Sequence, residues 1–229
     1  IADFRAEDGG PHPACPRSLL KRMRDKAAAM GMSATFACEY EFFFFKETPD
    51  TLHDKGFRKL TQLTPGMFGY SFVRAGQNKE LMAAIMDQMQ AFDVEIEGLH
   101  TETGPGVYEA AILFSGALEA ADRAILFKAA AKEIGSRYGI MPSFMAKWSP
   151  RYPGCSGHLH QSLSDGTRNL FHDPKGRHGG MSKLFESYLA GQLAALMEMA
   201  PMIWPTVNSY KRLVDGVWAP VKPPGGGDN

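Results

Sequence analysis

Apolar residues recur at every third or fourth position in four stretches of the chain, which is the spacing of one helix face. The predicted helices run from Arg17 to Gly31, Asn78 to Phe92, Leu118 to Tyr138 and Met181 to Ala200. We expect each apolar stripe to face the core, and we expect Pro201 to end the fourth helix. The stripes comprise Leu19, Met23, Ala27 and Met30; Leu81, Ile85, Met89 and Phe92; Leu118, Ala121, Ile125 and Ala129; and Phe185, Leu189, Leu193 and Leu196.

Extended segments rich in aromatic and β-branched residues lie between these helices. They run from Ala34 to Phe45, Val94 to His100, Val107 to Phe114, Met141 to Trp148 and His158 to Leu163. Helices and strands interleave, but the connections are long and irregular. The pattern therefore predicts an α+β domain built on one sheet rather than a regular βαβ repeat.

The composition excludes several classes of protein. The 229 residues carry 25 Lys and Arg against 25 Asp and Glu, whereas a sequence-independent nucleic-acid binder needs a basic excess. No apolar run approaches the roughly 20 residues that span a bilayer, so a membrane span is not expected. Cys15, Cys38 and Cys155 form no CxxC motif, which argues against a disulfide scaffold and a thiolate zinc site and fits the reducing cytoplasm.

Two carboxylates, Glu39 and Glu41, stand within the apolar residues 38–45. Residues two apart in a strand share a face and lie about 6.6 Å apart. Burying two carboxylates without partners costs a large free energy, so arginine side chains or a divalent metal ion are expected to meet them. The alternative is an edge strand with one wet face, on which both carboxylates stay solvated.

A second group of acids surrounds a tight turn. Glu95, Glu97 and Glu102 precede the Gly-Pro-Gly turn at 104–106, and Glu109 follows it. Any one of these acids alone is typical of solvated surface. Several of them in apolar strands offer the oxygen ligands that Mg²⁺ and Mn²⁺ prefer.

Two later segments carry histidines and cations. His158 and His160 lie two apart within the Gly-rich residues 154–163, so in an extended chain they face the same way. An HxH pair alone is a weak metal signal, and it gains weight beside strand carboxylates. Residues 208–213 contain two cations, one of them Arg212. This segment is either a solvated helix-exit loop or a binder of phosphate or carboxylate, because Arg binds both bidentately.

Four motifs occur in a recognisable order. They are Glu39-x-Glu41-Phe42; Glu97-Gly98-Leu99-His100-x-Glu102-x-Gly104-Pro105-Gly106-x-Tyr108-Glu109; Ser156-Gly157-His158-x-His160-Gln161-Ser162-Leu163; and Asn208-Ser209-Tyr210-Lys211-Arg212-Leu213. In this order and at these spacings the motifs resemble the glutamine synthetase family. The resemblance covers Leu19 to Val221. It implies a partial catalytic domain over residues 1–221, with a largely antiparallel sheet and packed helices, followed by an irregular tail at 222–229.

The resemblance implies an ATP-dependent ligase that joins ammonia or an amine to the γ-carboxylate of glutamate through γ-glutamyl phosphate. It also implies ATP and two or more Mg²⁺ or Mn²⁺ ions as cofactors, and a homo-oligomeric assembly. This chemistry brings anions together, so neutralising their charge with metal ions and an arginine is the main catalytic demand.

The family's site residues carry over onto matching positions of this chain. One metal ion is matched by Glu41, Glu102 and Glu109, and a second by Glu39 and His158. The ATP site is matched by Glu97, His160 and Ser162. The resemblance also matches Gly154 to the loop that holds substrate glutamate, Arg212 to an arginine on substrate carboxylate or transferring phosphate, and Tyr70 to a tyrosine near the ammonium pocket.

The sequence departs from the family pattern at three places. Trp218 stands where a Glu commonly closes the ammonium pocket. A tryptophan ring holds an organic cation by cation–π attraction, worth on the order of 0.5–2 kcal/mol, which favours an amine as the acceptor. Val107 stands where Gln is frequent, and the chain shows neither the family's small N-terminal domain nor its later Arg-rich strands.

These departures support one alternative, a catalytically impaired synthetase-like protein with a structural or assembly role. The retained acids speak against it, because a scaffold has no need for buried unpaired carboxylates. A Mg²⁺-dependent kinase or nucleotidyl transferase would share the metal chemistry. That interpretation does not account for the four ordered motifs, and the chain has no GxxxxGK[ST] loop.

Overall fold

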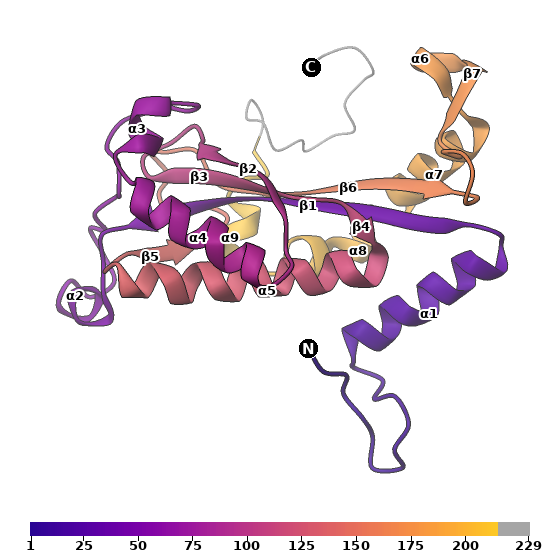
Figure 1. Cartoon of the computed structure of the whole chain (residues 1–229), viewed down its shortest axis with the longest axis horizontal. Coiled ribbons are helices and arrows are strands. Elements are labelled where there is room, and N and C mark those ends of the chain that lie inside the picture. Colours follow the sequence, from indigo (N-terminus) through magenta and orange to yellow (C-terminus); the bar gives the residue numbers. More distant parts are fainter. Residues whose placement is uncertain (215–229) are drawn as a thin grey trace.

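The computed structural model describes residues 1–214, and within them six strands form one sheet (Figure 1). The strands are β1 (Ser33–Phe45), β2 (Ile96–Thr101), β3 (Val107–Ile112), β4 (Ser115–Gly116), β5 (Met141–Ser143) and β6 (Gly157–Ser164). Every pairing in this sheet is antiparallel. The predicted α+β class with a largely antiparallel sheet is therefore confirmed.

Strand β1 lies at the centre of the sheet. It pairs with β3 along one edge, from Glu39↔Ala111 to Phe43↔Val107, and with β6 along the other, from Ser33↔Ser164 to Tyr40↔Gly157. The edge position proposed in the alternative is therefore wrong, whereas Glu39 on this face keeps 26% of its side chain exposed. The acidic residues of this strand lie in the middle of the sheet, where neighbouring strands bring further side chains beside them.

The four consecutive phenylalanines that end β1 are fully buried because both faces of the strand are covered there. Phe42 and Phe44 pack into the main core with side chains of α4 (Lys79–Ala91) and α5 (Ala117–Arg137). Phe43 and Phe45 pack on the opposite face with Val107, Cys155 and Trp148. Burial on both faces produces a continuous apolar run instead of alternation. Val107, the residue that replaces a frequent Gln, is thus a core side chain.

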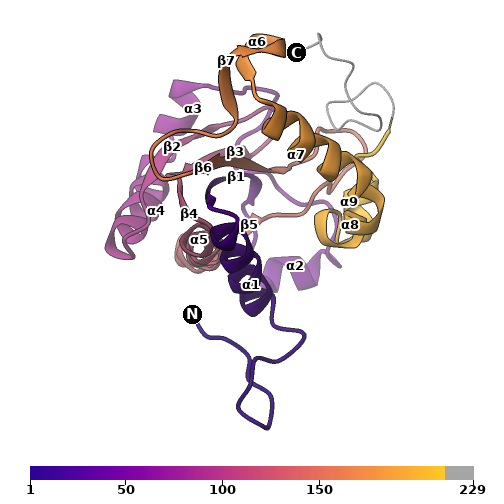
Figure 2. The same cartoon turned by 90° about the vertical axis from the view of Figure 1, so that its right-hand side faces the viewer.

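Helices cover the core side of the sheet. Figures 1 and 2 both place α5 and α1 (Pro16–Ala29) on the same side of β1, and α5 packs against β1, α1 and α4. The segment that follows β6 contains α7 (Lys183–Ala194), α8 (Leu196–Ile203) and α9 (Val207–Tyr210), which lie together in Figure 2 and are called the helical arm. The remaining short elements are α2 (Pro49–Asp54), α3 (Phe72–Gly76), α6 (Arg177–Gly180) and β7 (His172–Gly176).

The predicted core-facing residues are correct for some helices and wrong for others. Three of the four stripe residues of α4 are buried, as expected. In α5 the predicted stripe is wrong, because Ile125 is 61% exposed while the buried face carries Ala120, Ala124 and Phe127. Apolar residues occur all round this alanine-rich helix, so periodicity alone does not select the face. The small alanines instead let the helix approach the sheet closely.

Two further helical expectations are corrected. The predicted α1 stripe stays largely uncovered within residues 1–214, with Met30 64% exposed. The predicted fourth helix is broken at Ala195 into α7 and α8, and Pro201 lies inside α8 instead of ending a helix. Proline removes its own N–H donor but has φ compatible with a helix, so the two residues after it remain helical.

One predicted strand is shorter than expected, and two predictions concern residues outside the described part of the chain. The predicted strand from Met141 to Trp148 ends as a strand at Ser143. Beyond it the chain turns toward the loop before β6, where the Ala146 carbonyl accepts from the Cys155 N–H at 2.9 Å. Trp218 and the tail at 222–229 lie outside the described residues. Over residues 1–214, none of the helices combines the length and apolar composition needed to cross a bilayer.

A buried carboxylate fixes the chain just after β1. The Glu47 side chain is fully buried and accepts from Lys55 Nζ at 2.6 Å, Thr51 Oγ1 at 2.7 Å and the Thr61 N–H at 2.7 Å. Burial alone would raise the pKa of Glu47, but these three donors outweigh it and hold the pKa at about 2. The carboxylate therefore joins β1, α2 and the segment that returns to the sheet.

We expect Glu47→Gln to destabilise the protein at neutral pH by about 1–3 kcal/mol, the usual value of hydrogen bonds to a charged group. Because the folded pKa is depressed, the stabilisation is present above the unfolded value near 4.3 and is lost as pH falls toward 2. Thermal unfolding of wild type and variant between pH 7 and pH 3 should therefore converge on the acid side. Glu133→Gln, at an exposed ion pair, is the matched control. An equal loss of stability there would contradict the stabilising role of the buried Glu47 carboxylate.

Candidate metal and substrate site

The register of four strands, β1, β2, β3 and β6, brings acidic and imidazole side chains to one face of the sheet. Glu41 pairs across the strands with Glu109, and Glu39 pairs with His158. On the next strand, His100 pairs with the same Glu109. Residues directly opposite each other in an antiparallel pair point to the same face. Side chains distant in sequence therefore meet over the middle of β1.

The first group of potential ligands consists of Glu39, Glu109 and His158. Each offers one ligand atom, and these atoms lie within 4.8 Å of one another. His158 Nδ1 lies 3.3 Å from Glu39 Oε2 and 3.9 Å from Glu109 Oε1. Glu39 Oε2 also lies 3.0 Å from His160 Nε2, so a second imidazole borders this group.

The second group consists of His100, Glu102 and Glu109, whose ligand atoms again lie within 4.8 Å of one another. His100 Nε2 lies 3.8 Å from Glu109 Oε2. Glu109 belongs to both groups and offers one carboxylate oxygen toward each. The two groups of potential ligands are therefore neighbours that share one central carboxylate.

The electrostatics of Glu109 show how unfavourable this arrangement is without a cation. Its side chain is only 9% exposed. Burial, followed by the nearby charges of Glu39 and Glu41, raises the pKa of Glu109 to about 8. Burial acts in the same direction on Glu39, but its contacts with His160 and His158 outweigh burial and lower the pKa of Glu39 overall.

Glu102 provides the test of whether a metal ion fits here. Its Oε2 is buried and has no hydrogen-bond partner in the described part of the chain, whereas its Oε1 accepts from the Thr103 N–H at 2.6 Å. Burial raises the pKa of Glu102, but the Thr103 N–H and the Tyr70 hydroxyl outweigh it and lower the pKa overall. A charged carboxylate with one free buried oxygen, beside other carboxylates and imidazoles, fits Mg²⁺ or Mn²⁺.

Glu41 lies outside both groups of potential ligands, whereas His100, to which the sequence assigned no role, lies in one of them. Glu41 belongs to neither group of potential ligands; its Oε2 accepts from the Ser156 N–H at 2.5 Å and Ser156 Oγ at 3.0 Å. His100 received no role from the sequence, although strand alternation already places it on the same face as Glu102. Only the pairing with β3 shows that the face is shared with Glu109.

The predicted nucleotide residues lie partly together. Glu97 and His160 line one hollow of about 290 Å³ together with Glu39. A register shift between Ile96 and Gly98 is a bulge in β2, and bulges re-aim side chains, which accounts for the place of Glu97. Ser162 lies two residues beyond His160 on β6 and is not among the residues that line this hollow.

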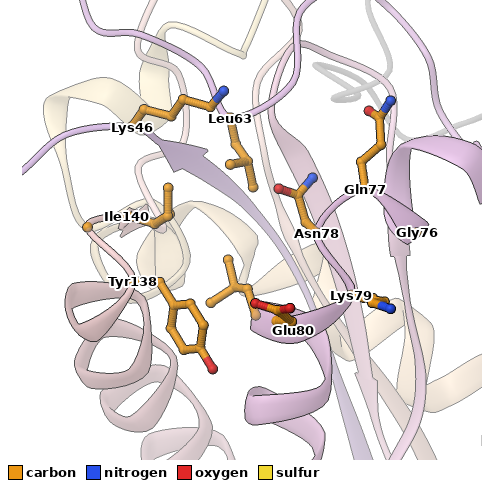
Figure 3. A pocket seen from close by; sticks show the side chains of 11 residues that line it. Lys46, Leu63, Gly76, Gln77, Asn78, Lys79, Glu80, Tyr138 and Ile140 are labelled. Atoms are coloured by element: carbon orange, nitrogen blue, oxygen red, sulfur yellow. The ribbon is translucent and has the colours of Figure 1, made fainter.

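A larger hollow of about 570 Å³ lies elsewhere, between the first turn of α4 and the end of α5 (Figure 3). Its side chains include Lys46, Gln77, Lys79, Glu80 and Tyr138. None of the predicted site residues lines it. The predicted residues Glu39, Glu97 and His160 line the smaller hollow instead.

The predicted substrate residues lie on three connecting segments, with Tyr70 before α3, Gly154 before β6 and Arg212 after α9. Arg212 packs directly on Gly154, since a Cβ at Gly154 would lie 2.7 Å from Arg212 Cδ and 2.3 Å from the Ala146 carbonyl oxygen. Tyr70 is 71% exposed and stacks beside His100, with ring centroids 5.1 Å apart. The neighbouring Glu102 carboxylate raises the pKa of Tyr70 to about 12.

Comparison with known proteins identifies the family. The family model described as the glutamine synthetase catalytic domain matches residues 13–229. The chain belongs to the glutamine synthetase family. A type-1 glutamine synthetase 2 from Dictyostelium discoideum is 51% identical over 232 residues, covering 100% of this chain and 44% of that protein. The γ-glutamylethanolamide synthetase GlnA4 of Streptomyces coelicolor is 35% identical, covering 100% of this chain and 49% of that protein.

Solved structures agree with the glutamine synthetase fold. A structure titled apo GmaS without ligand superposes with a TM-score of 0.81 at 29% identity, covering 93% of this chain and 48% of that one. A glutamine synthase homolog superposes with the same TM-score at 27% identity, covering 94% of this chain and 47% of that one. The chain spans about half the length of the relatives it matches. The ligand, nucleotide and substrate roles of individual residues stay predictions.

Proposed function

We propose that the whole protein joins ammonia or an amine to the γ-carboxylate of glutamate, with ATP forming γ-glutamyl phosphate on the way. The observation that carries this proposal is the pair of carboxylate–imidazole groups that share Glu109. Membership of the glutamine synthetase family supports it, because relatives of this chain are named glutamine synthetases and glutamate–amine ligases.

The charges of the side chains suggest which residues would hold cations and which would bind anions. Glu39, His158 and Glu109 would hold one divalent cation, and His100, Glu102 and Glu109 the other. Mg²⁺ or Mn²⁺ there would offset the charge of the nucleotide phosphates and of the transferring phosphoryl group. Arg212, seated against Gly154, would pair with a substrate carboxylate or with the phosphoryl group.

The acceptor amine must lose a proton before it attacks the acyl phosphate. Tyr70 and Glu102 supply an exposed aromatic ring next to a charged carboxylate, a combination that attracts ammonium or an organic cation. Trp218, the residue that favours an amine, lies outside the described residues, so the choice of acceptor is left to experiment.

Phosphate release by the full-length protein tests the proposal. With glutamate, ATP and Mg²⁺ or Mn²⁺, we expect release to require an acceptor, and alkylamines such as methylamine, ethanolamine and isopropylamine to serve at least as well as ammonia. Glu102→Gln is the inactive comparison, because it removes the charge of a candidate ligand. A clear preference for ammonia would contradict the acceptor assignment, and no release with any acceptor would favour a structural role.

We further propose that the whole protein acts as a homo-oligomer in the cytoplasm. Apolar side chains on the helical arm support the first part: Met197, Met202 and Val207 are exposed within residues 1–214. These residues lie on the consecutive helices α8 and α9, and large contiguous apolar patches on soluble proteins mark interaction sites. The three cysteines are all unpaired, which agrees with a reducing compartment.

A further inference from the structure

Tyr70 occupies an unusual backbone position for its residue type. Its φ is +54°, in the left-handed region that an aromatic L-residue rarely adopts. Such a conformation persists only where the surroundings hold it, and it is concentrated at sites where a side chain has to be aimed. What holds Tyr70 is therefore as informative as Tyr70 itself.

The residue that holds this turn is Thr101, at the end of β2. Its carbonyl oxygen accepts from the Tyr70 N–H at 2.7 Å, and its Oγ1 accepts from the Ser71 N–H at 2.8 Å. Thr101 is only 2% exposed and stands opposite the buried Tyr108 in the sheet, so it cannot move without disturbing the core. Two consecutive N–H groups of the turn are thus fixed to one rigid residue.

The turn is also pressed against the strand end. A Cβ at Gly69 would lie 2.9 Å from Thr103 Oγ1 and 3.1 Å from the Thr103 nitrogen. With glycine at 69 and the two hydrogen bonds of Thr101, the Tyr70 ring is placed 5.1 Å from the His100 ring. The aromatic ring therefore projects over the second group of potential ligands.

We propose that Thr101 is a positioning residue, whose hydroxyl and carbonyl clamp the Tyr70–Ser71 turn and thereby aim Tyr70 at the amine acceptor. Because Thr101 is buried, its role is to act through Tyr70. The inference rests on the proposed function and adds to it a buried residue, at the end of β2, that sets how tightly the acceptor is held.

The test compares Thr101→Val and Thr101→Ser in the full-length protein. Valine keeps the branched shape but removes the acceptor of the Ser71 N–H, whereas serine keeps the hydroxyl. We expect Thr101→Val to raise the KM for the amine about tenfold, with the KM for ATP and the Kd for Mn²⁺ within about twofold of wild type. Thr101→Ser should stay close to wild type, as should Thr64→Val, a matched substitution of another buried threonine.

Hydrogen exchange provides a readout that does not need turnover. The Ser71 amide should exchange at least about tenfold faster in Thr101→Val than in wild type or Thr101→Ser, because its acceptor is gone. An unchanged exchange rate, an unchanged KM for the amine, or equal damage by serine and valine would overturn the inference. So would a rise in the KM for ATP as large as that for the amine, since that indicates general distortion.

Failure of the proposed function is recognised separately. If the wild-type protein releases no phosphate with any acceptor, the ligase proposal falls and the acceptor role of Thr101 falls with it. If the wild type is active and Thr101→Val binds the amine normally, only the positioning inference falls.

Discussion

Glu109→Gln is expected to weaken Mn²⁺ binding by more than about 100-fold, while leaving the metal-free protein at least as stable as wild type. Glu109 is the one carboxylate common to both groups of potential ligands in the described residues, so its loss affects both cation positions. Even partners that only orient a ligand are worth about 10- to 100-fold in metal affinity. Titration calorimetry of the full-length protein with Mn²⁺ measures the loss directly.

The stability part of this prediction follows from the raised pKa of Glu109. The folded protein keeps a proton at Glu109 up to about pH 8, whereas the unfolded chain loses it near pH 4.3. Because the folded state binds more protons across this window, the contribution of Glu109 makes metal-free stability fall as pH rises from about 4.3 to 8. Glutamine cannot ionise, so the variant should lack this component of the decline.

Metal binding reverses the protonation of Glu109. A bound dication needs the ionised carboxylate, so Mn²⁺ affinity should rise with pH up to about 8, and binding near pH 7 should release a proton. Ser33→Ala, an exposed substitution on β1 away from the acids, is the control. Wild-type Mn²⁺ affinity in Glu109→Gln, or a metal-free variant less stable than wild type at pH 8, would contradict the shared-ligand interpretation.

Gly154→Ala is expected to lower kcat/KM for glutamate about 100-fold, the order of loss that a misplacement of about 1 Å causes. A methyl group there would lie 2.3 Å from the Ala146 carbonyl oxygen, a backbone clash, and 2.7 Å from Cδ of the flexible Arg212 side chain, so both have to shift. The Ala146 oxygen is fixed by the Cys155 N–H, so the loop and Arg212 have to move. We expect a further destabilisation of about 1–3 kcal/mol from the overpacking.

Steady-state phosphate release at varied glutamate, together with thermal unfolding, measures both effects. Gly76→Ala is the matched control, because no atom lies within 4 Å of its added methyl group. It should change stability by no more than about 0.5 kcal/mol and leave the KM for glutamate unchanged. A Gly154→Ala protein with normal glutamate kinetics would show that contact between Gly154 and Arg212 has no part in binding the substrate.

Local patterns predicted the strands better than the helix faces. The central strand was predicted to within one residue because four consecutive phenylalanines permit only a segment buried on both faces. The alanine-rich helix α5 was located correctly, but the wrong face was predicted to be buried. Small apolar residues occur all round the helix, so packing decides which face is buried. The break at Ala195 was not predicted for a related reason: apolar residues continue across it without a change of period.

By itself, the sequence determined the family, the α+β class and the acidic and imidazole residue types at the site. These follow from residue order and from the rule that strand residues two apart share a face. Only the tertiary structure showed that Glu109 belongs to both groups of potential ligands, that His100 lies beside it, and that Glu41 accepts hydrogen bonds from Ser156. Those facts depend on which strands are neighbours and in what register, and that is fixed by burial of the whole sheet, not by any one segment.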